Sequence, residues 1–324
     1  MRCILKLARR ATNPQFYDIV IGGELFDFAM AIPDSLRIRM PLDALEFLPV
    51  LTEMQARSGM LARTVARLHD IPDDELRAFR RPLAGEELLA PVDPPSFRDF
   101  YAFERHVINA RRRRGLEMVP EWYEAPVFYF SNAASILGTD AHVRKPAETN
   151  ELDFELEIAA VIGKPGRDIP VEEADTYIAG FMILNDWSAR DIQRQEMKVG
   201  LGPAKGKDFA TSIGPFLVTP DELADRLLPD RTRGNVYDLT MTAAINGQEI
   251  SRGNANEMHW TFAELIARAS QNTLLRAGDL IGSGTVGTGC ITEFPTGTYP
   301  WLQIGDIVRL EIESLGALEN TIVE

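Results

Sequence analysis

Cysteine, histidine and long apolar runs are scarce in this chain. Its 324 residues include two cysteines, Cys3 and Cys290, and four histidines. Two cysteines can form at most one disulfide bond, so they cannot build a disulfide framework or a four-cysteine zinc site. No apolar run approaches the roughly 20 residues that a membrane helix needs, and the first residues lack the apolar core of a secretory signal. We therefore expect a cytoplasmic protein in a reducing compartment, with no membrane partner.

Positive charge is also in short supply. The chain has 34 Lys and Arg against 48 Asp and Glu, which gives a net charge of −14. Such a surface repels phosphate backbones, so nucleic acid is not an expected partner. The only basic run, residues 111–114, is most simply a solvated helix face. The remaining composition, 45% hydrophobic and 25% charged, is typical of a globular protein.

The first 90 residues have a different pattern from the rest. An apolar periodicity from Pro41 to Leu68 predicts a helix or helix pair over about 41–70. The polar, proline-rich stretch over residues 70–95 resembles a linker. We therefore expect a small N-terminal region over 1–90 and a second, larger domain over 91–324.

The larger domain is expected to be rich in strands. Its short apolar runs contain β-branched residues and are separated by turn signals. Two helices are indicated by capping-box spacing, one from Ser188 with Asp191 and one from Thr261 with Glu264. The predicted fold class is therefore α+β, strand-rich. The expected strands cover residues 127–130, 154–162, 177–184, 239–245, 279–283 and 307–312.

Acidic residues alternate with apolar ones over residues 151–158. In a strand, this period places Asp153, Glu155 and Glu157 on one face. Like charges at that spacing repel, so the face must be solvated or covered by something positive. For this segment alone, a solvated strand edge is the simpler interpretation.

A further acid, Asp186, follows a continuous apolar run that predicts a strand covered on both faces. A carboxylate there is costly unless it is paired, caps a helix or binds a metal. Carboxylates without cysteine or clustered histidine suit Mg²⁺, Ca²⁺ or Mn²⁺ better than zinc. Lys207 lies in a glycine-containing loop that could bring an ammonium to these acids, although plain surface charge is the simpler interpretation.

Four separated motifs resemble, in order, those of the fumarylacetoacetate hydrolase family. Residues 99–101 with His106 are similar to the Asp-Phe-Tyr segment that precedes the family's catalytic histidine. The other three are the Glu-x-Glu strand at 154–157, the Asn-Asp-Trp-Ser-Ala-Arg-Asp-x-Gln turn at 185–193, and the Ser-Gly-Thr loop at 282–285. The resemblance covers about 95–323. It implies a mixed β-roll core, a catalytic domain over 91–324 and a homodimer.

The resemblance also implies roles for individual residues. One divalent metal, Mg²⁺ with Ca²⁺ or Mn²⁺ as substitutes, would be bound with Asp153 outside the ligand set. The implied ligands are Asp99, Glu155, Glu157 and Asp186, with Lys207 and Thr211 against the metal. The implied substrate contacts are Tyr101, Tyr129, Arg190, Gln193 and Thr285.

His106 is the water-activating base that the resemblance implies, and Glu293 is the acid that orients it. A neutral imidazole can take a proton from water near pH 7. Without the resemblance, residues 100–113 read as an ordinary helix in which the histidine has a structural role. The arginine that follows the family's histidine has no clear equivalent here, since this chain has the run 111–114 instead.

These roles predict a Mg²⁺-dependent hydrolase that cleaves a carbon–carbon bond in a small β-diketo acid, as in aromatic-compound catabolism. The metal would stabilise the departing enolate, and Lys207 would add positive charge. One alternative is a decarboxylase or tautomerase of a 2-oxo acid such as oxaloacetate on the same metal. The other is a non-catalytic metal-binding scaffold, which has no use for His106, Lys207 and Thr285.

Overall fold

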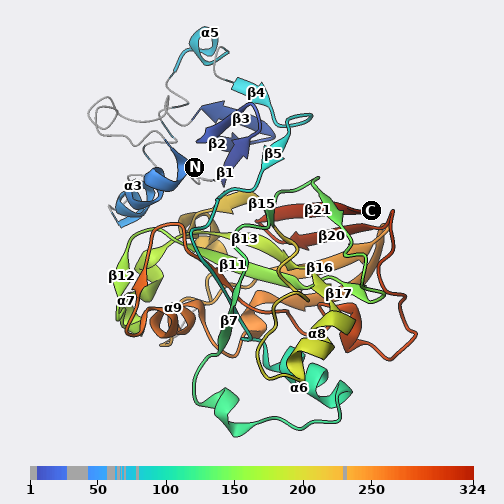
Figure 1. Cartoon of the computed structure of the whole chain (residues 1–324). Helices are drawn as coiled ribbons and strands as arrows, with labels where there is room; N and C mark the ends of the chain where they lie inside the picture. The colour runs from blue at the N-terminus through green and yellow to red at the C-terminus, as the bar shows by residue number, and fades with distance from the viewer. Residues whose placement is uncertain are drawn as a thin grey trace.

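The computed structural model describes residues 6–27, 43–56, 71–77, 80–228 and 232–324, together with Arg63, Ala66 and Leu68. Within these residues, strands dominate and helices are mostly short (Figure 1). None of the helices described is long and apolar enough to cross a membrane. The strand-rich fold class predicted from the sequence is confirmed.

The largest sheet of the described residues has twelve strands. Ten follow the order β4-β3-β2-β1-β15-β13-β11-β19-β6-β7, while β5 pairs with β1 and β8 pairs with β15. The sheet is mixed, because β19–β6 and β15–β8 are parallel and the other pairs are antiparallel. Its strands are β1 (Lys6–Arg10), β2 (Asn13–Ile21), β3 (Glu24–Asp27), β4 (Arg80–Pro82), β5 (Leu88–Leu89), β6 (Phe97–Phe100), β7 (Phe128–Ser131), β8 (Ile136–Leu137), β11 (Leu156–Ile162), β13 (Ile178–Asp186), β15 (Thr211–Val218) and β19 (Leu280–Gly282).

A second sheet of five strands, in the order β17-β16-β20-β21-β9, packs beside the first. Figure 1 shows β20 and β21 next to β13 and β15. Two further pairs, β10–β14 and β12–β18, complete the strands of the described residues. The bounds are β9 (His142–Arg144), β16 (Thr240–Ile245), β17 (Gln248–Asn254), β20 (Ile307–Ile312), β21 (Gly316–Val323), β10 (Leu152–Asp153), β14 (Ser188–Ala189), β12 (Gly166–Arg167) and β18 (Leu274–Leu275).

The helices lie around the sheets (Figure 1). In α9, the Thr261 hydroxyl accepts from the Glu264 N–H and the Glu264 carboxylate accepts from the Thr261 N–H, which confirms the predicted capping box. The α-helices are α3 (Ala44–Ala56), α5 (Asp73–Leu76), α6 (Glu104–Arg113), α7 (Val171–Ala174), α8 (Arg190–Met197) and α9 (Phe262–Ser270). The short 3₁₀ helices are η1 (Pro120–Tyr123), η2 (Asp175–Tyr177), η3 (Pro220–Arg226), η4 (Ala255–Glu257) and η5 (Ile291–Glu293).

Strands β11 and β13 form the centre of the fold because both are buried along their whole length. Alternate residues of these strands face two different hydrophobic cores. Ile158 and Ile183 face the cluster that includes the second sheet, while Ala159 and Met182 face the cluster that includes α3. This double burial explains why the two segments are nearly continuous apolar runs in the sequence. Any carboxylate at the ends of these strands is therefore held in a fixed, water-poor position.

The N-terminal region agrees with its prediction only in part. The predicted helix or helix pair over about 41–70 includes α3, which ends at Ala56. The described residues 63, 66 and 68 are also helical, and the rest of 57–70 lies outside the described residues. Strands β1 to β3 were missed, and the predicted linker contains α5, β4 and β5. Because Lys6 and Leu7 pair with Val218 and Leu217 of β15, the region extends the large sheet. The domain division near residue 90 stays a prediction.

The predicted helix start at Ser188 is wrong. Ser188 pairs with Asp153 in the short ladder β10–β14, and α8 begins at Arg190 without a side-chain cap. The Asp191 carboxylate accepts from the Thr149 hydroxyl and the Asn150 N–H instead of capping the helix. The tertiary contact with the 149–150 turn therefore outcompetes the local capping box.

Candidate active site

Three buried carboxylates meet at the ends of neighbouring strands. Asp99 lies in β6, Glu157 in β11 and Asp186 at the end of β13. Their ligand oxygens lie within 4.8 Å of one another. The strand order β13-β11-β19-β6 brings them together, because β19 lies between β11 and β6 and contributes only Gly282 opposite Asp99.

These carboxylates have the properties of a cation site. Among the described residues, Asp99 Oδ1 and Asp186 Oδ1 are buried without a hydrogen-bond partner, which is costly for a carboxylate. Burial, and then the neighbouring acids, raise the pKa of Asp99 and of Glu157 well above its ordinary value. A hard divalent cation would pair these oxygens and offset the repulsion. The residues therefore fit the predicted Mg²⁺, Ca²⁺ or Mn²⁺.

Glu155, a predicted ligand, is bound by two cationic side chains. Arg190 Nη2 donates to its Oε1 at 2.8 Å and Lys207 Nζ to its Oε2 at 2.6 Å. Burial alone would raise the pKa of Glu155, but Lys207 and Arg190 outweigh it and hold this pKa far below its ordinary value. Glu155 lies outside the group of mutually close carboxylates, so its direct part in metal binding stays a prediction.

Lys207 is buried and is not plain surface charge. Its Nζ donates to Asp186 Oδ2 at 2.5 Å as well as to Glu155. Burial lowers the pKa of Lys207, but the two carboxylates more than compensate and raise it. The side chain therefore places a permanent positive charge against the carboxylate cluster. Thr211, also buried, lies beside Asp186 because the two residues pair across β15 and β13.

Tyr129 contacts the carboxylates directly. It lies opposite Asp99 in the β6–β7 ladder, and its hydroxyl donates to Asp186 Oδ2 at 2.5 Å and to Asp99 Oδ2 at 3.3 Å. Burial, followed by the charges of Asp186 and Asp99, raises the pKa of Tyr129 well above its ordinary value. The phenol is therefore a hydrogen-bond donor that orients the acids as well as a predicted substrate contact.

Arg190 links the site to Asp153. Its Nε donates to Asp153 Oδ2 at 2.8 Å, and its Nη1 donates to the Gln193 side chain at 3.2 Å. Asp153 is fully buried and also accepts from the Ile291 N–H at 2.8 Å. The interpretation of this segment as a solvated strand edge is therefore wrong, because Asp153, Glu155 and Glu157 are all buried. The segment is also not one strand, since β10 ends at Asp153 and β11 begins only at residue 156. Asp153 lies outside the carboxylate group.

The loop after β19 holds Glu157. The Gly284 N–H donates to Glu157 Oε2 at 3.0 Å, and the Thr285 hydroxyl donates to Oε1 at 3.4 Å. Gly284 has a φ of +77°, and a Cβ there would lie 2.5 Å from the Phe100 carbonyl oxygen. Only glycine satisfies both the backbone conformation and the close approach. The Ser-Gly-Thr loop of the sequence therefore orients a carboxylate of the cluster.

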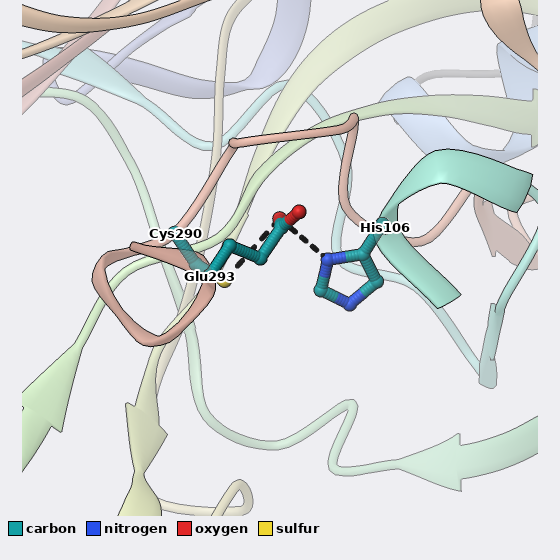
Figure 2. A group of neighbouring side chains, drawn as sticks. All are labelled: His106, Cys290 and Glu293. Carbon is teal, nitrogen blue, oxygen red and sulfur yellow. Dashed lines mark hydrogen bonds and ion pairs between the residues drawn. The ribbon is translucent and has the colours of Figure 1, made fainter. Parts of the chain in front are cut away.

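His106 and Glu293 form a buried pair (Figure 2). His106 Nδ1 lies 2.7 Å from Glu293 Oε1. Burial favours the neutral acid, but His106 and hydrogen bonds from Asn109 and the Thr288 N–H lower the pKa of Glu293. The ionised carboxylate accepts, so the proton lies on Nδ1. The other ring nitrogen, Nε2, points away from Glu293 in Figure 2 and is free to act as a base.

Three neighbours of this pair were not predicted as site residues. Asn109 follows His106 by one helical turn on α6 and donates to Glu293 Oε2 at 2.8 Å, and the Thr288 N–H donates to the same oxygen at 2.9 Å. Cys290 is a buried, free thiol next to Glu293, while Cys3 lies outside the described residues. Only the spacing of Asn109 from His106 was a signal in the sequence.

Tyr101 packs against His106. Their rings meet edge-on with centroids 5.3 Å apart. Burial raises the pKa of Tyr101 to about 12, so its hydroxyl remains a donor at neutral pH. The basic run at the end of α6 is largely exposed, as predicted, although Arg113 donates to the Glu293 carbonyl oxygen at 3.3 Å.

Comparisons with known proteins agree with this fold. The family model described as fumarylacetoacetate (FAA) hydrolase C-terminal matches residues 96–323. The chain therefore belongs to the fumarylacetoacetate hydrolase family. Fumarylacetoacetase of Rattus norvegicus is 31% identical over 267 residues, which cover 70% of this chain and 63% of that protein. A mitochondrial oxaloacetate tautomerase of Xenopus laevis is 36% identical over 201 residues, which cover 61% of this chain and 58% of that protein.

Solved structures share the fold over nearly the whole chain. A fumarylacetoacetate hydrolase of Exiguobacterium antarcticum has a TM-score of 0.72 at 24% identity, covering 98% of this chain and 99% of that one. A maleylpyruvate hydrolase of Sphingobium has a TM-score of 0.67 at 21% identity, covering 98% and 99%. By sequence, the match spans only about 63% of the length of curated fumarylacetoacetases.

Proposed function

We propose that this chain is a divalent-metal-dependent hydrolase that cleaves a carbon–carbon bond in a β-diketo acid of the fumarylacetoacetate or acylpyruvate type, as in aromatic-compound catabolism. The observation that carries the proposal is the buried His106–Glu293 pair, which leaves Nε2 as a free base. Its partner is the group of Asp99, Glu157 and Asp186, which fits a hard cation.

The metal would be held by Asp99, Glu157 and Asp186, with Lys207 and Thr211 against it and Glu155 adjacent. When bound, a divalent cation such as Mg²⁺ supplies Lewis-acid polarisation of the substrate's oxygens. Lys207 is already positioned by two carboxylates and adds a fixed positive charge at the same place. No rearrangement of these side chains is needed to stabilise an anionic group that develops there.

His106 performs the proton transfer in this proposal. Its Nε2 takes a proton from water while Nδ1–H keeps donating its hydrogen bond to the Glu293 carboxylate. This carboxylate holds the neutral ring in one tautomer and stabilises the imidazolium that forms. The resulting hydroxide attacks a ketone carbon of the substrate, and the bond to the neighbouring carbon breaks. The proton returns from Nε2 to the departing carbanion, so the base is regenerated.

The proposed substrate contacts surround these groups. Tyr101 packs against His106, while Thr285 lies against Glu157. Arg190 donates to acids through Nε and Nη2 and to the Gln193 side chain through Nη1. Its N–H groups that make none of these bonds, together with the Gln193 amide, are the proposed donors to a substrate group. We also propose that the protein is a homodimer, as the family resemblance implies.

A second candidate is a tautomerase or decarboxylase of a 2-oxo acid such as oxaloacetate. It is favoured by the similarity to the oxaloacetate tautomerase of Xenopus laevis. The same carboxylate group would serve it, but His106 would then shuttle a proton to or from carbon and would not generate a hydroxide. A non-catalytic scaffold has no use for a buried histidine–glutamate pair such as His106 and Glu293, so it is the less consistent reading.

Product analysis tests the proposal. The full chain is incubated with an acylpyruvate, fumarylacetoacetate and oxaloacetate, with Mg²⁺ or with a chelator. We expect the diketo acids to be cleaved only with metal, and the acid product to contain ¹⁸O from labelled water. If the diketo acids are inert while oxaloacetate is enolised or loses carbon dioxide without ¹⁸O entry, the hydrolase proposal fails and the second candidate replaces it.

A further inference from the structure

A second group of potential metal ligands surrounds the histidine–glutamate pair. His106 Nδ1, Cys290 Sγ and a Glu293 carboxylate oxygen lie within 4.8 Å of one another, and all three residues are buried (Figure 2). They offer one nitrogen, one sulfur and one oxygen. This donor set suits Zn²⁺ and other thiophilic cations, whereas the oxygen-only cluster of Asp99, Glu157 and Asp186 suits Mg²⁺.

Glu293 is held so that one oxygen faces both other ligands. Its Oε2 is fixed by Asn109 at 2.8 Å and by the Thr288 N–H at 2.9 Å. Its Oε1 accepts from His106 Nδ1 at 2.7 Å and from the Cys290 thiol at 3.6 Å. Two protons, one on nitrogen and one on sulfur, therefore point at the same carboxylate oxygen.

We propose that His106, Cys290 and Glu293 form a binding site for a thiophilic divalent cation such as Zn²⁺, and that binding there inhibits the enzyme. The cation takes the place of the two protons that point at Oε1. The Nδ1–H and Sγ–H bonds break, and bonds from Nδ1, Sγ and Oε1 to the cation form. The ring stays neutral because its proton is exchanged from Nδ1 to Nε2, whereas the thiol proton leaves to solvent. One single positive charge leaves and one double charge enters, so the two anionic ligands, the Cys290 thiolate and the Glu293 carboxylate, neutralise the cation.

The distances require only a small adjustment. In a tetrahedral zinc site with Zn–S of about 2.3 Å and Zn–N and Zn–O of about 2.0 Å, sulfur and oxygen lie about 3.5 Å apart and nitrogen and oxygen about 3.3 Å apart. The Sγ–Oε1 distance of 3.6 Å already agrees with this geometry. The Nδ1–Oε1 distance of 2.7 Å must open by about 0.6 Å, which a shift of α6 against η5 provides.

The inhibitory effect rests on the proposed function, in which His106 is the base. A cation on Nδ1 leaves the proton of the neutral ring on Nε2, so the nitrogen that would take a proton from water is no longer a base. Zn²⁺ should therefore inhibit without displacing Mg²⁺ from the carboxylate cluster. Zinc bound at the cluster instead would inhibit by competition with Mg²⁺.

Binding is tested with Cd²⁺, which gives a thiolate-to-metal charge-transfer band in the ultraviolet. The full chain, loaded with Mg²⁺, is titrated with Cd²⁺. We expect the band to saturate at one Cd²⁺ per chain in the wild type and in the control Cys3→Ser, and to be missing in Cys290→Ser. A band that persists in Cys290→Ser, that disappears in Cys3→Ser, or that never forms would overturn the site.

A second variant covers the case in which Cys290→Ser does not fold. His106→Gln keeps the thiol and removes the nitrogen ligand. Because even partners outside the ligand shell are worth about 10- to 100-fold in metal affinity, Cd²⁺ affinity should fall at least tenfold in this variant. Unchanged affinity would contradict the assignment.

Kinetics then separate this inference from the proposed function. Zinc inhibition of each variant is expressed relative to its own zinc-free rate at saturating Mg²⁺. We expect the half-inhibiting Zn²⁺ concentration to rise at least about tenfold in Cys290→Ser but not in Cys3→Ser. Equal inhibition of all three proteins would show that zinc acts at the carboxylate cluster. If the wild-type protein shows the charge-transfer band but has no hydrolase activity, the metal site stands and the proposed reaction is refuted.

Discussion

His106 Nδ1 and Glu293 Oε1 lie 2.7 Å apart although 187 positions separate the two residues in the sequence. The contact joins α6 to η5. The other carboxylate oxygen of Glu293, Oε2, accepts hydrogen bonds from Asn109 and from the Thr288 N–H. Every hydrogen bond to Glu293 favours its ionised form, which is why the pKa of this carboxyl is lowered despite its burial. The arrangement gives Nδ1 the proton and makes Nε2 the only basic position of the ring.

Replacing Glu293 with Gln should therefore slow a diketo acid hydrolase without removing its metal site. The amide keeps the shape but loses the charge that stabilises the imidazolium, so we expect kcat to fall by about a hundredfold to ten-thousandfold. Mg²⁺ affinity, measured by calorimetry, should be unchanged, because Glu293 is not in the carboxylate cluster. Glu249→Gln, at an exposed position of β17, is the matched control and should have wild-type kinetics. Equal rates in the two variants would exclude a catalytic role for the His106–Glu293 pair.

The metal site is tested at Asp186. In Asp186→Asn the amide oxygen keeps its place but carries no charge, so Mg²⁺ or Mn²⁺ binding should weaken and activity should be lost. Glu155→Gln should also lose activity, through the displacement of Lys207 and Arg190 as well as through any direct contact. If calorimetry gives wild-type metal affinity for Asp186→Asn, the three-carboxylate site is wrong.

Asp153 should matter for stability more than for metal binding. Asp153→Asn leaves the buried Arg190 with one fewer counterion. Removing one partner of a buried ion pair typically costs about 3 to 5 kcal/mol, so the midpoint of urea unfolding should fall clearly. Metal affinity should change much less than in Asp186→Asn. A variant as stable as the wild type would mean that Glu155 alone is enough to hold Arg190.

How far the sequence predicts the fold depends on where polar residues lie. Strands β11 and β13 were predicted because both of their faces are apolar and buried. Strand β1 was missed because it contains Arg9 and Arg10, whose charges disguise a buried strand. In the structure these side chains are paired with Asp93 and Asp18, which compensates their burial. No local pattern predicts such pairing, since the partners come from other segments.

The site shows the same limit. Asp99, Glu157, Asp186 and His106 were predicted because they lie in or beside short motifs that a family resemblance makes visible, and Glu293 was predicted from its place eight residues after Thr285. Asn109, Thr288 and Cys290 carry no motif, and their contacts with Glu293 exist only after α6 and η5 meet. The burial of Lys207 was likewise hidden, because a lysine in a glycine-containing loop is usually solvated.

A rise in pH should lower the stability of the metal-free protein, whereas bound Mg²⁺ should raise it. Burial, followed for Asp99 and Glu157 by the neighbouring acids, raises the pKa values of Asp99, Glu157 and Asp186. Such carboxyls bind more protons when folded than when unfolded. The metal-free protein should therefore lose stability as pH rises from their ordinary values near 4 towards the raised ones. Mg²⁺ pairs the ionised groups, so it should raise Tm more at pH 7 than at pH 5. An identical Mg²⁺-induced shift at both pH values would contradict this account.

Two reasons for glycine at position 284, its backbone conformation and the space around it, are separated by comparison with Gly297. Gly284 and Gly297 both have positive φ, +77° and +84°, but a Cβ at Gly297 would meet nothing within 4 Å, whereas at Gly284 it would lie 2.5 Å from the Phe100 carbonyl oxygen. Gly297→Ala should therefore cost only the left-handed backbone penalty of about 1 to 2 kcal/mol in urea unfolding, with normal activity. Gly284→Ala carries the same penalty and the clash.

To relieve that clash, the loop must move away from Phe100, and the Gly284 N–H moves with it off Glu157 Oε2. Gly284→Ala should thus be less stable than Gly297→Ala and should also bind Mg²⁺ more weakly, because Glu157 loses the donor that fixes its carboxylate. Thermal unfolding and metal calorimetry on the two variants measure both effects. If both variants lose equal stability and keep wild-type metal affinity, the loop after β19 does not orient the cluster, and the glycine is required only for its backbone conformation.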